Sequence, residues 1–459
     1  MFLPVRYLKN TIPVKIARFL SSRPDTKAKL YYQMNQMDAN LELPEIPYFG
    51  KEVVNRVSFL REDSDFISRA ATHGSSRFIF YENGSPLVNK TAKDGKLVIL
   101  TNGDGQLTTI PDTSVAGTTL GLQNRPEWQQ ILDTWTSENK SQLPEIRDDG
   151  KPSFLFIGIK DETVGLDFRV LKQFEHETYL DHQGRYFGIP YFGVDVTNSP
   201  KTVDLIKEHI TQNAAVNADD LIFTDSRKHT MGFTMEESAL FSHGKMYFDW
   251  LGRNRFCPGC GTKVIGIHAG GKLKCTNETK TTVDNIEKYA CPVRNTRVSN
   301  VSFPRTDAVV ITAITNREKT KMLLSLNKRH AQTMMYSCTA GFMEPSETVE
   351  VATKREIWEE TGVACSDIQI LMTQPWPFPG NLMIGCVAIV DFNGLNENIH
   401  LGHDRELADA RWFDIGLVRK LLTNSASKEE NPEGVFLPPD VSIAYSLIKY
   451  VTDRSDIKL

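Results

Sequence analysis

Short apolar runs divide the first part of the chain into strand-like and helix-like segments. Between residues 48 and 199, runs such as RFIFY, KLVIL, SFLFIGI and RYFGIPYFGV alternate with turn clusters such as ENGSP and NGDG. Apolar runs of this length that are bounded by Gly, Pro and Asn are typical of strands. Helical spacing of apolar residues follows in KTVDLIKEHI and in MEESALFSHGKMYFDWLGRNRF. We therefore predict an α+β domain over residues 48–250.

The last part of the chain, residues 303–459, alternates between strand-like and helix-like patterns. The strand-like runs AVVITAI, KMLLSL and LMIGCVAIV flank a helical segment at residues 348–360, and a second helical segment covers residues 442–451. Alternating strands and helices bury their apolar faces against one another. This pattern predicts a compact α/β domain at the end of the chain.

Composition narrows the class of protein. The chain of 459 residues exceeds the usual domain length of roughly 100–200 residues, so more than one core is expected. Hydrophobic residues make up 40% and charged residues 24%, which excludes a wholly disordered or fibrous protein. The 57 acidic and 53 basic side chains nearly balance, so overall charge gives no attraction to nucleic acid or membranes. Any anionic substrate must bind at a local site.

The two ends of the chain carry targeting signals of moderate specificity. Residues 1–47 form a basic leader with no acid before Asp25, a composition typical of mitochondrial transit peptides and also of disordered basic tails. Initiation at Met34 or Met37 would remove most of this leader. The C-terminal Asp456–Leu459 is similar to the Ser-Lys-Leu peroxisomal signal, with a bulky Ile in place of a small residue, and the alternative is a chance ending without targeting function. We expect a peroxisomal or cytoplasmic protein with a mitochondrial isoform as the alternative. No apolar run approaches the roughly 18 residues that span a bilayer, so no membrane partner is expected.

Four of the seven cysteines lie in one short stretch of the chain; they are Cys257, Cys260, Cys275 and Cys291. This clustering indicates metal binding in a reducing compartment and not a secreted disulfide scaffold. In the segment CPGCG, two thiolates can bind one ion because the glycines let backbone NH groups turn toward the sulfurs. A β-hairpin at Gly270 and Gly271 would return Cys275 to the same ion.

Cys291 is the expected fourth ligand, although fifteen residues separate it from Cys275. The insertion must loop outward, and loop-closure entropy grows only slowly with loop length, so the site tolerates it. We therefore predict a zinc ribbon over residues 251–302, with His268 as an alternative ligand. Four protein ligands leave no open coordination position, so this zinc is expected to be structural.

Three glutamates at helical spacing give the main chemical signal. Glu356, Glu359 and Glu360 stand at positions i, i+3 and i+4, so their carboxylates share one helix face. Three like charges repel one another, whereas a divalent cation needs clustered oxygen ligands and would cancel the repulsion. Arg355 can brace Glu347 with bidentate hydrogen bonds. Taken alone, such a cluster is also compatible with a solvated helix face.

The segment from Gly341 to Val363 resembles the Nudix box, G-x5-E-x7-R-E-U-x-E-E-x-G-U with U aliphatic, at every fixed position. The resemblance implies a Nudix hydrolase domain, an α/β/α sandwich that uses Mg²⁺ or Mn²⁺, over residues 303–459. It implies that Glu356 and Glu360 are metal ligands and that Glu359 is a further ligand or the base that activates water. The carbonyl of Ala340 is expected to complete the coordination, and Arg355 belongs to the catalytic set.

A second resemblance concerns the segment from Thr373 to Asn381, TQPWPFPGN, which is similar to the S-Q-P-W-P-x-P-x-S signature of NADH pyrophosphatases. Thr373 and Asn381 stand where the signature has its first and last serines. These differences bear on the order of preference among substrates and not on the family. The resemblance, which is to the fungal and peroxisomal enzymes, implies that Gln374, Trp376 and Pro377 bind substrate as a rigid wall. The alternative is a stiff turn in which the prolines fix the path and the Trp simply packs.

Three further positions match the NADH pyrophosphatases. Glu406 corresponds to a distal glutamate of the metal cluster, and Phe342 to an aromatic that stacks on the base. Phe303 takes the place of a Tyr that the second subunit often contributes, so a homodimer is expected. The complete fold class is therefore α/β (α+β): an N-terminal α+β domain, a zinc ribbon and a Nudix sandwich.

The function implied by these resemblances is metal-dependent hydrolysis of the pyrophosphate of NADH and NAD⁺ to NMNH or NMN and AMP. Removal of NAD caps from RNA is a related activity. Because the chain is almost neutral, we expect RNA activity to rest on recognition of the cap and not on a basic groove. The alternatives are a Nudix hydrolase for ADP-ribose or diadenosine polyphosphates, and a non-catalytic zinc-ribbon binding module. No glutamate of the box is lost, which argues against the last.

Overall fold

The computed structural model describes residues 47–92, 96–103, 121–141, 150–160, 179–214, 216–283, 286–296 and 302–454. The predicted basic leader, apart from residue 47, and the C-terminal Asp456–Leu459 lie outside these residues. From residue 46 onward the chain forms one compact unit. Among the described helices, none has the length and apolar character that a membrane span requires.

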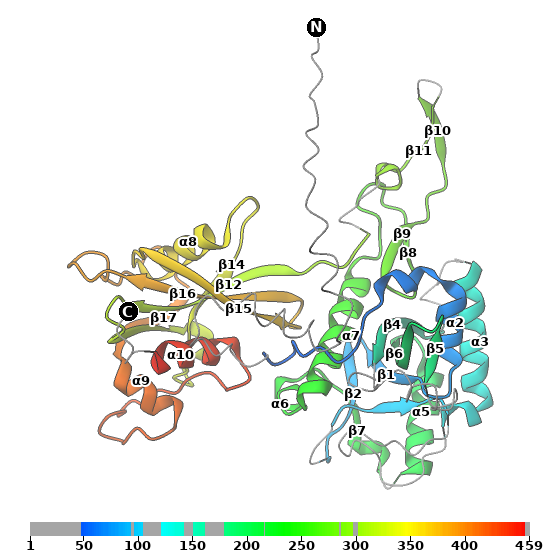
Figure 1. The fold of residues 1–459 in the computed structure, drawn as a ribbon, viewed down its shortest axis with the longest axis horizontal. Coiled ribbons are helices and arrows are strands. Elements are labelled where there is room, and N and C mark those ends of the chain that lie inside the picture. Colours follow the sequence, from blue (N-terminus) through cyan, green and yellow to red (C-terminus); the bar gives the residue numbers. More distant parts are fainter. Residues whose placement is uncertain are drawn as a thin grey trace, which may run out of the picture. The chain divides into compact units, whose positions relative to one another are not determined.

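A seven-stranded sheet forms the first core (Figure 1). Its strands are β1 (Arg77–Glu82), β2 (Ser85–Asn89), β3 (Ile99–Thr101), β4 (Ser153–Lys160), β5 (Leu180–His182), β6 (Tyr186–Asp195) and β7 (Leu221–Phe223). The order is β4-β6-β1-β2-β7, with β3 on β1 and β5 on β6, and only β1 and β6 run parallel among these pairs. The predicted runs RFIFY, SFLFIGI and RYFGIPYFGV therefore all form strands.

Helices cover this sheet and bury its aromatic side chains. They are α2 (Ser64–Thr72), α3 (Pro126–Ser141), α5 (Pro200–Asn213) and α7 (Met235–Arg253). The short helix α6 (Arg227–Thr230) precedes α7, and the 3-10 turns of this part are η1 (Ser58–Glu62), η2 (Leu122–Asn124) and η3 (Ala218–Asp220). Phe78, Trp128 and Phe192 are fully buried in the core beneath α2 and α3. Helix α7 begins at Thr234 with a capping box, in which the Glu237 carboxylate also accepts the Leu97 amide at 2.9 Å. The helix is thereby fixed to the sheet at its first turn.

Two small hairpins follow α7. The first pairs β8 (Val264–Ile267) with β9 (Lys272–Cys275), and its return strand carries Cys275, as predicted. The second pairs β10 (Lys280–Val283) with β11 (Ile286–Tyr289) and is followed by η4 (Pro292–Asn295). The insertion between Cys275 and Cys291 is thus a hairpin, which extends beyond β8 and β9 (Figure 1).

A six-stranded sheet forms the last core. Its strands are β12 (Asp307–Asn316), β13 (Lys321–Asn327), β14 (Thr339–Phe342), β15 (Asp367–Trp376), β16 (Asn381–Val390) and β17 (Leu407–Asp414), and its helices are η5 (Lys328–His330), α8 (Val349–Thr361), α9 (Ile415–Leu422) and α10 (Ile443–Asp453). The order is β15-β16-β12-β13-β17, with β14 on β12. The central pair, β12 and β16, is parallel over its full length.

Alternate residues of β12 face opposite layers. Ile314 packs with Ile357 of α8, whereas Ala313 packs in the cluster that contains Leu447 and Ile448 of α10. Because successive strand residues point to opposite faces, α8 must lie on one side of the sheet and α10 on the other. The predicted α/β/α sandwich is confirmed, and so is the mixed α/β class of the whole chain.

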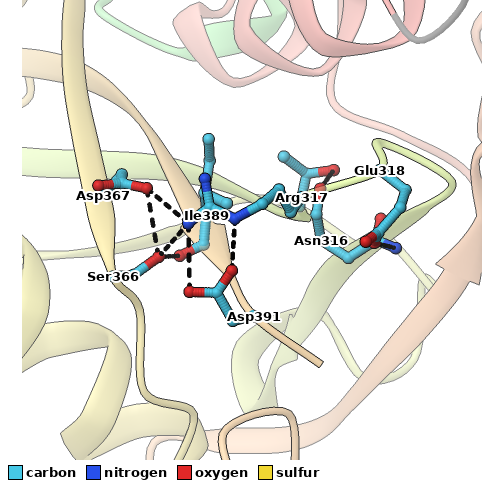
Figure 2. A network of polar contacts seen from close by, with 8 residues as sticks. Asn316, Arg317, Glu318, Ser366, Asp367, Ile389 and Asp391 are labelled. Atoms are coloured by element: carbon cyan, nitrogen blue, oxygen red, sulfur yellow. Dashed lines mark hydrogen bonds and ion pairs between the residues drawn. The ribbon is translucent and has the colours of Figure 1, made fainter. Parts of the chain in front are cut away.

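A polar network ties three strand ends together on this sheet (Figure 2). Arg317, in the turn after β12, forms ion pairs with Asp367 (Nη2 to Oδ2, 2.7 Å) and with Asp391 after β16. Ser366 accepts a hydrogen bond from the same guanidinium and donates its amide to the Ile389 carbonyl at 2.8 Å. All three charged side chains are half exposed, so the network holds the strands in register more than it adds stability.

The segment TQPWPFP joins the two large cores. The Gln374 side chain is fully buried; its amide nitrogen donates to the carbonyls of Tyr48 and Val441, each at 2.9 Å, and its oxygen accepts the Ile443 amide at 2.8 Å. Trp376 and Phe378 pack edge-on against Phe49, with ring centroids 5.8 and 6.0 Å away. The Gln374 side chain therefore connects its own strand, β15, to Tyr48 of the first core and to the start of α10.

We predict that Gln374→Ala destabilises the protein by about 3 kcal/mol, because it leaves buried backbone groups without partners. Thermal unfolding of the full chain would show a fall of several degrees in the melting temperature. Gln369→Ala is the matched control, since Gln369 is exposed on the same strand and should change stability by less than about 0.5 kcal/mol. Equal, small effects of the two changes would contradict the structural function of Gln374.

Candidate active site

Helix α8 presents the glutamates because both of its ends are fixed locally. The Thr348 hydroxyl accepts the Val351 amide at 3.3 Å, which caps the N-terminus. Gly362 ends the helix in the left-handed region (φ 73°), and its amide donates to the Trp358 carbonyl at 2.8 Å. The observed bounds, Val349–Thr361, agree with the predicted helix at residues 348–360.

The turn of α8 that carries Glu356 lies directly on strand β14. A Cβ atom added to Gly341 would stand 1.9 Å from the carboxylate carbon of Glu356. Only glycine can occupy this position without displacing the carboxylate. Ala340, the residue predicted to offer its carbonyl, precedes Gly341 on the same strand.

Arg355 holds the acidic groups of the loop and the helix in place. Its Nε and Nη2 donate to the two oxygens of Glu347 at 2.7 and 2.9 Å, the bidentate pair that the sequence predicts. Its Nη1 donates to Glu356 at 2.8 Å and to Glu359 at 3.0 Å, and Nη2 also donates to the Phe342 carbonyl at 2.8 Å. Arg355 and the Glu344 amide lower the pKa of Glu347 to about 2. One guanidinium therefore organises the whole segment.

Glu360 is buried among other acids. Its residue is 4% exposed, and burial, followed by the charges of Glu406, Glu356 and Asp404, raises its pKa to about 8. Burial is also the main reason why the pKa of Glu356 is raised. Glu406 accepts a hydrogen bond from Asn327 at 2.7 Å and pairs with Arg329 at 3.4 Å. The charges around Glu360 are close enough to raise the pKa of that carboxyl, and a divalent cation would relieve the repulsion.

The carboxylates are less tightly grouped than the cysteines. Among the described residues, the four cysteines are the group in which at least three possible ligand atoms lie within 4.8 Å of one another. Glu356 and Glu359 each point an oxygen at Arg355, and Glu359 is 41% exposed. The buried Glu360 contributes to a set of oxygen donors that suits a hard cation. The half-exposed Glu359 can exchange protons with water.

Asn327 and Arg329 are site residues that no motif in the sequence identifies. They end strand β13 and begin η5, and both contact Glu406, which lies 79 and 77 residues further along the chain. The only sequence signal is that polar and basic residues, NKRH, follow directly after a buried strand.

The predicted substrate-binding residues separate into two groups. Phe342 is 58% exposed beside Arg355, as a stacking surface requires. Val309 pairs with Phe342 on one side and with Met383 on the other, and Met383 pairs with Gln374. Three strand spacings of about 4.8 Å therefore put Gln374 roughly 14 Å from Phe342. The Gln374 side chain is also buried, with its nitrogen and its oxygen engaged in hydrogen bonds inside the protein, and its binding of substrate stays a prediction.

Trp376, Pro377 and Phe303 show different environments. Trp376 packs against Phe49, and the guanidinium carbon of Arg227 lies 5.6 Å from its ring centroid, while Pro377 is buried. These contacts agree with the alternative in which the Trp packs. Phe303 is 46% exposed, and the Lys272 ammonium lies 5.3 Å from its ring.

A cavity of about 850 Å³ lies beside this segment. The residues that line it include Phe49, Tyr247, Pro304, Pro375 and Asn381. Both ends of the β15–β16 connection therefore face a space large enough for a nucleotide.

The four cysteines form a compact sulfur cluster. The Sγ atoms of Cys257 and Cys291 are 3.6 Å apart, and those of Cys260 and Cys275 are 3.5 Å apart. These distances are too long for disulfides and close to the edge of a tetrahedron with bonds of about 2.3 Å to a central ion. The Thr262 hydroxyl and backbone lower the pKa of Cys260 to about 6, which favours the thiolate. The cluster can hold a tetrahedral metal ion.

His268 is not part of the cluster. Its Nδ1 lies 3.5 Å from Glu62, and the residue occupies the hairpin turn with φ 53°. Among the described residues, the group of possible ligand atoms consists of the four sulfurs and does not include His268, so the structure does not support the alternative ligand.

The site and the fold define a Nudix hydrolase. The NUDIX domain family matches residues 304–431. The chain is 38% identical over 416 residues to the NAD-capped RNA hydrolase NPY1 of Saccharomyces cerevisiae, covering 89% of this chain and 96% of the relative. It is 36% identical over 408 residues to the human NAD-capped RNA hydrolase NUDT12, covering 88% and 72%. Human mitochondrial NAD(P)H pyrophosphatase NUDT13 is 29% identical over 231 residues, covering 50% and 58%. The chain belongs to the Nudix family and shares most of its length with the NAD-capped RNA hydrolases.

The Arg355–Glu347 pair predicts a pH dependence of stability. Because the folded pKa of Glu347, about 2, lies below its ordinary value of 4.5, the pair stabilises the protein above pH 4.5 and loses this effect as pH falls toward 2. We expect Glu347→Gln to lower the melting temperature near neutral pH. Its melting temperature should approach that of the wild type as pH falls from 4.5 toward 2.

Glu350→Gln is the matched control, since Glu350 is exposed in the first turn of the same helix. Near neutral pH, its melting temperature should differ less from that of the wild type than the melting temperature of Glu347→Gln does. A gap between wild type and Glu347→Gln that stayed constant down to pH 3 would show that the ion pair is not its source.

Proposed function

We propose that this protein hydrolyses the pyrophosphate bond of NADH and NAD⁺ to NMNH or NMN and AMP, and that it removes NAD caps from RNA. The observation that carries the proposal is the acidic cluster of α8 and Glu406, organised by Arg355 and by the glycine under Glu356. Relatives that align with most of this chain and are named NAD-capped RNA hydrolases support it.

We infer that Glu356, Glu360 and Glu406, with the Ala340 carbonyl, would hold Mg²⁺ or Mn²⁺. Such an ion neutralises pyrophosphate charge and lowers the pKa of a bound water. Glu359 is half-exposed and hydrogen-bonded to Arg355, so its carboxylate can take the proton of the attacking water while Arg355 keeps its orientation. Phe342 would stack on a base at the rim of the site.

We propose that the ion in the cysteine cluster is zinc and that it is structural. The four ligands are thiolates, the softness and geometry that zinc prefers, and they leave no open position for a substrate. The domain division into residues 48–250, 251–302 and 303–459 is also our proposal, supported by a separate sheet or hairpin pair in each part.

The assembly and the compartment stay predictions. A homodimer would let Phe303, which is 46% exposed, contribute to a neighbouring site. We infer a cytoplasmic or mitochondrial location, supported for the second by the relative named as mitochondrial. The peroxisomal signal falls on C-terminal residues outside the described part.

We predict that the purified protein with Mg²⁺ releases AMP from NADH and NAD⁺ faster than from ADP-ribose or diadenosine polyphosphates. Glu359→Gln should slow the reaction by about 100-fold or more, because it removes the base. Glu350→Gln on the same helix should stay within about 2-fold, as expected of an exposed residue outside the cluster. A Glu359→Gln enzyme as fast as the wild type would refute the site, and much faster cleavage of ADP-ribose would refute the substrate.

For the cysteine cluster, we predict one tightly bound zinc per chain by elemental mass spectrometry. Cys291→Ser should lose this zinc and unfold at a lower temperature, since metal binding contributes to folding. Cys365→Ser is the control, because Cys365 lies outside the cluster. Full zinc content in Cys291→Ser would exclude this residue as a ligand.

A further inference from the structure

Two short basic runs, about a hundred residues apart in sequence, each border the domain that carries the carboxylates. Arg227 and Lys228 begin α6, and Lys328 and Arg329 begin η5. Arg227 lies over the rings of Trp376 and Phe378, at 5.6 and 5.5 Å, so α6 borders the last sheet. Arg329 and Arg227 also both act on His330: after burial, their charges lower the pKa of this imidazole, so one cation of each run lies within electrostatic range of it.

The second run also borders the catalytic carboxylates. Arg329 pairs with Glu406 at 3.4 Å, and the Lys328 amide donates to the Glu406 carbonyl at 3.2 Å. The Lys328 ammonium contacts the carbonyl of Arg405, the residue before Glu406. We name the five cations of this region the basic strip: Arg227, Lys228, Lys328, Arg329 and Arg405.

The strip is exposed and only partly neutralised. All five of its residues are exposed, and the Arg329 side chain is 70% exposed. In the part of the chain that the structure describes, Arg227, Lys228 and Arg405 form no ion pair with a carboxylate. A local excess of positive charge therefore exists on a chain whose formal net charge is −4.

A free dinucleotide does not need such a surface, because its two phosphates lie at the metal ligands. A capped RNA does, because its phosphates continue from the cap and must leave the site across the adjoining surface. Cations along that path would release counterions from the RNA and so increase affinity.

We propose that the basic strip binds the phosphates of the RNA that follows the NAD cap. The proposal rests on the proposed function and departs from the expectation that RNA activity depends on cap recognition alone. An acidic peptide or a membrane is not covalently linked to a group bound at the carboxylates, so binding at the active site would not position either of them along the basic strip.

The test compares NAD⁺ with a 5′-NAD-capped oligoribonucleotide as substrates of the full chain. Lys228→Glu/Arg405→Glu reverses two charges of the strip at residues outside the proposed catalytic set. We expect kcat/KM for capped RNA to fall by about 10-fold and that for NAD⁺ to stay within about 2-fold. Lys201→Glu/Lys428→Glu is the charge-matched control, at exposed positions on α5 and after α9, and should leave both substrates unchanged.

A binding measurement separates this proposal from the proposed function. Fluorescence anisotropy with an uncapped single-stranded RNA should show affinity that falls with salt in the wild type, with a shallower salt dependence in Lys228→Glu/Arg405→Glu. The proposal would be overturned if Lys228→Glu/Arg405→Glu lowered kcat/KM equally for both substrates, left kcat/KM for capped RNA unchanged, or showed the same salt dependence of RNA binding as the wild type. If the wild type bound RNA in this way but cleaved neither substrate, the proposed function would fail and the strip would stand.

Discussion

The contact between Arg355 and the acidic groups around it is the interaction on which the site depends. Three glutamates within one helical turn repel one another, and Glu347 adds a fourth negative charge from the preceding loop. Arg355 uses its fork of donors on three of these carboxylates and on the Phe342 carbonyl. The same side chain thus reduces the repulsion and fixes strand β14, the loop and α8 relative to one another.

The sandwich supplies the rigid frame for that contact. Ile357 of α8 packs with Ile314 of β12, which fixes the helix on the sheet, and Glu356, the preceding residue, lies against Gly341 of β14. β14 pairs with β12 and passes below the helix, and Gly341 removes the one side chain that would hold the two apart. Side-chain packing on β12 and close backbone approach at β14 together set the position of Glu356.

The segment TQPWPFP shows how one motif can serve two purposes. Gln374 and Trp376 are used in contacts within the protein, with Tyr48 and Phe49 respectively. Pro375 and Asn381 line the large cavity next to this junction. A rigid loop whose polar side chain is buried can therefore shape a cavity through its backbone path, while its aromatic residues join the cores.

The sequence by itself determined what depends on local geometry. Helical spacing places the glutamates on one face, the sequence CPGCG and the next hairpin bring three sulfurs together, and alternating patterns identify the main strands. Only the tertiary structure decided which distant groups meet. Strand pairing and core packing bring Asn327 and Arg329 to Glu406, bury Gln374 against Tyr48, place His268 beside Glu62 and bring Arg227 of α6 to Trp376. The physical reason is that these contacts depend on sheet order and on packing between cores, which no short stretch of sequence encodes.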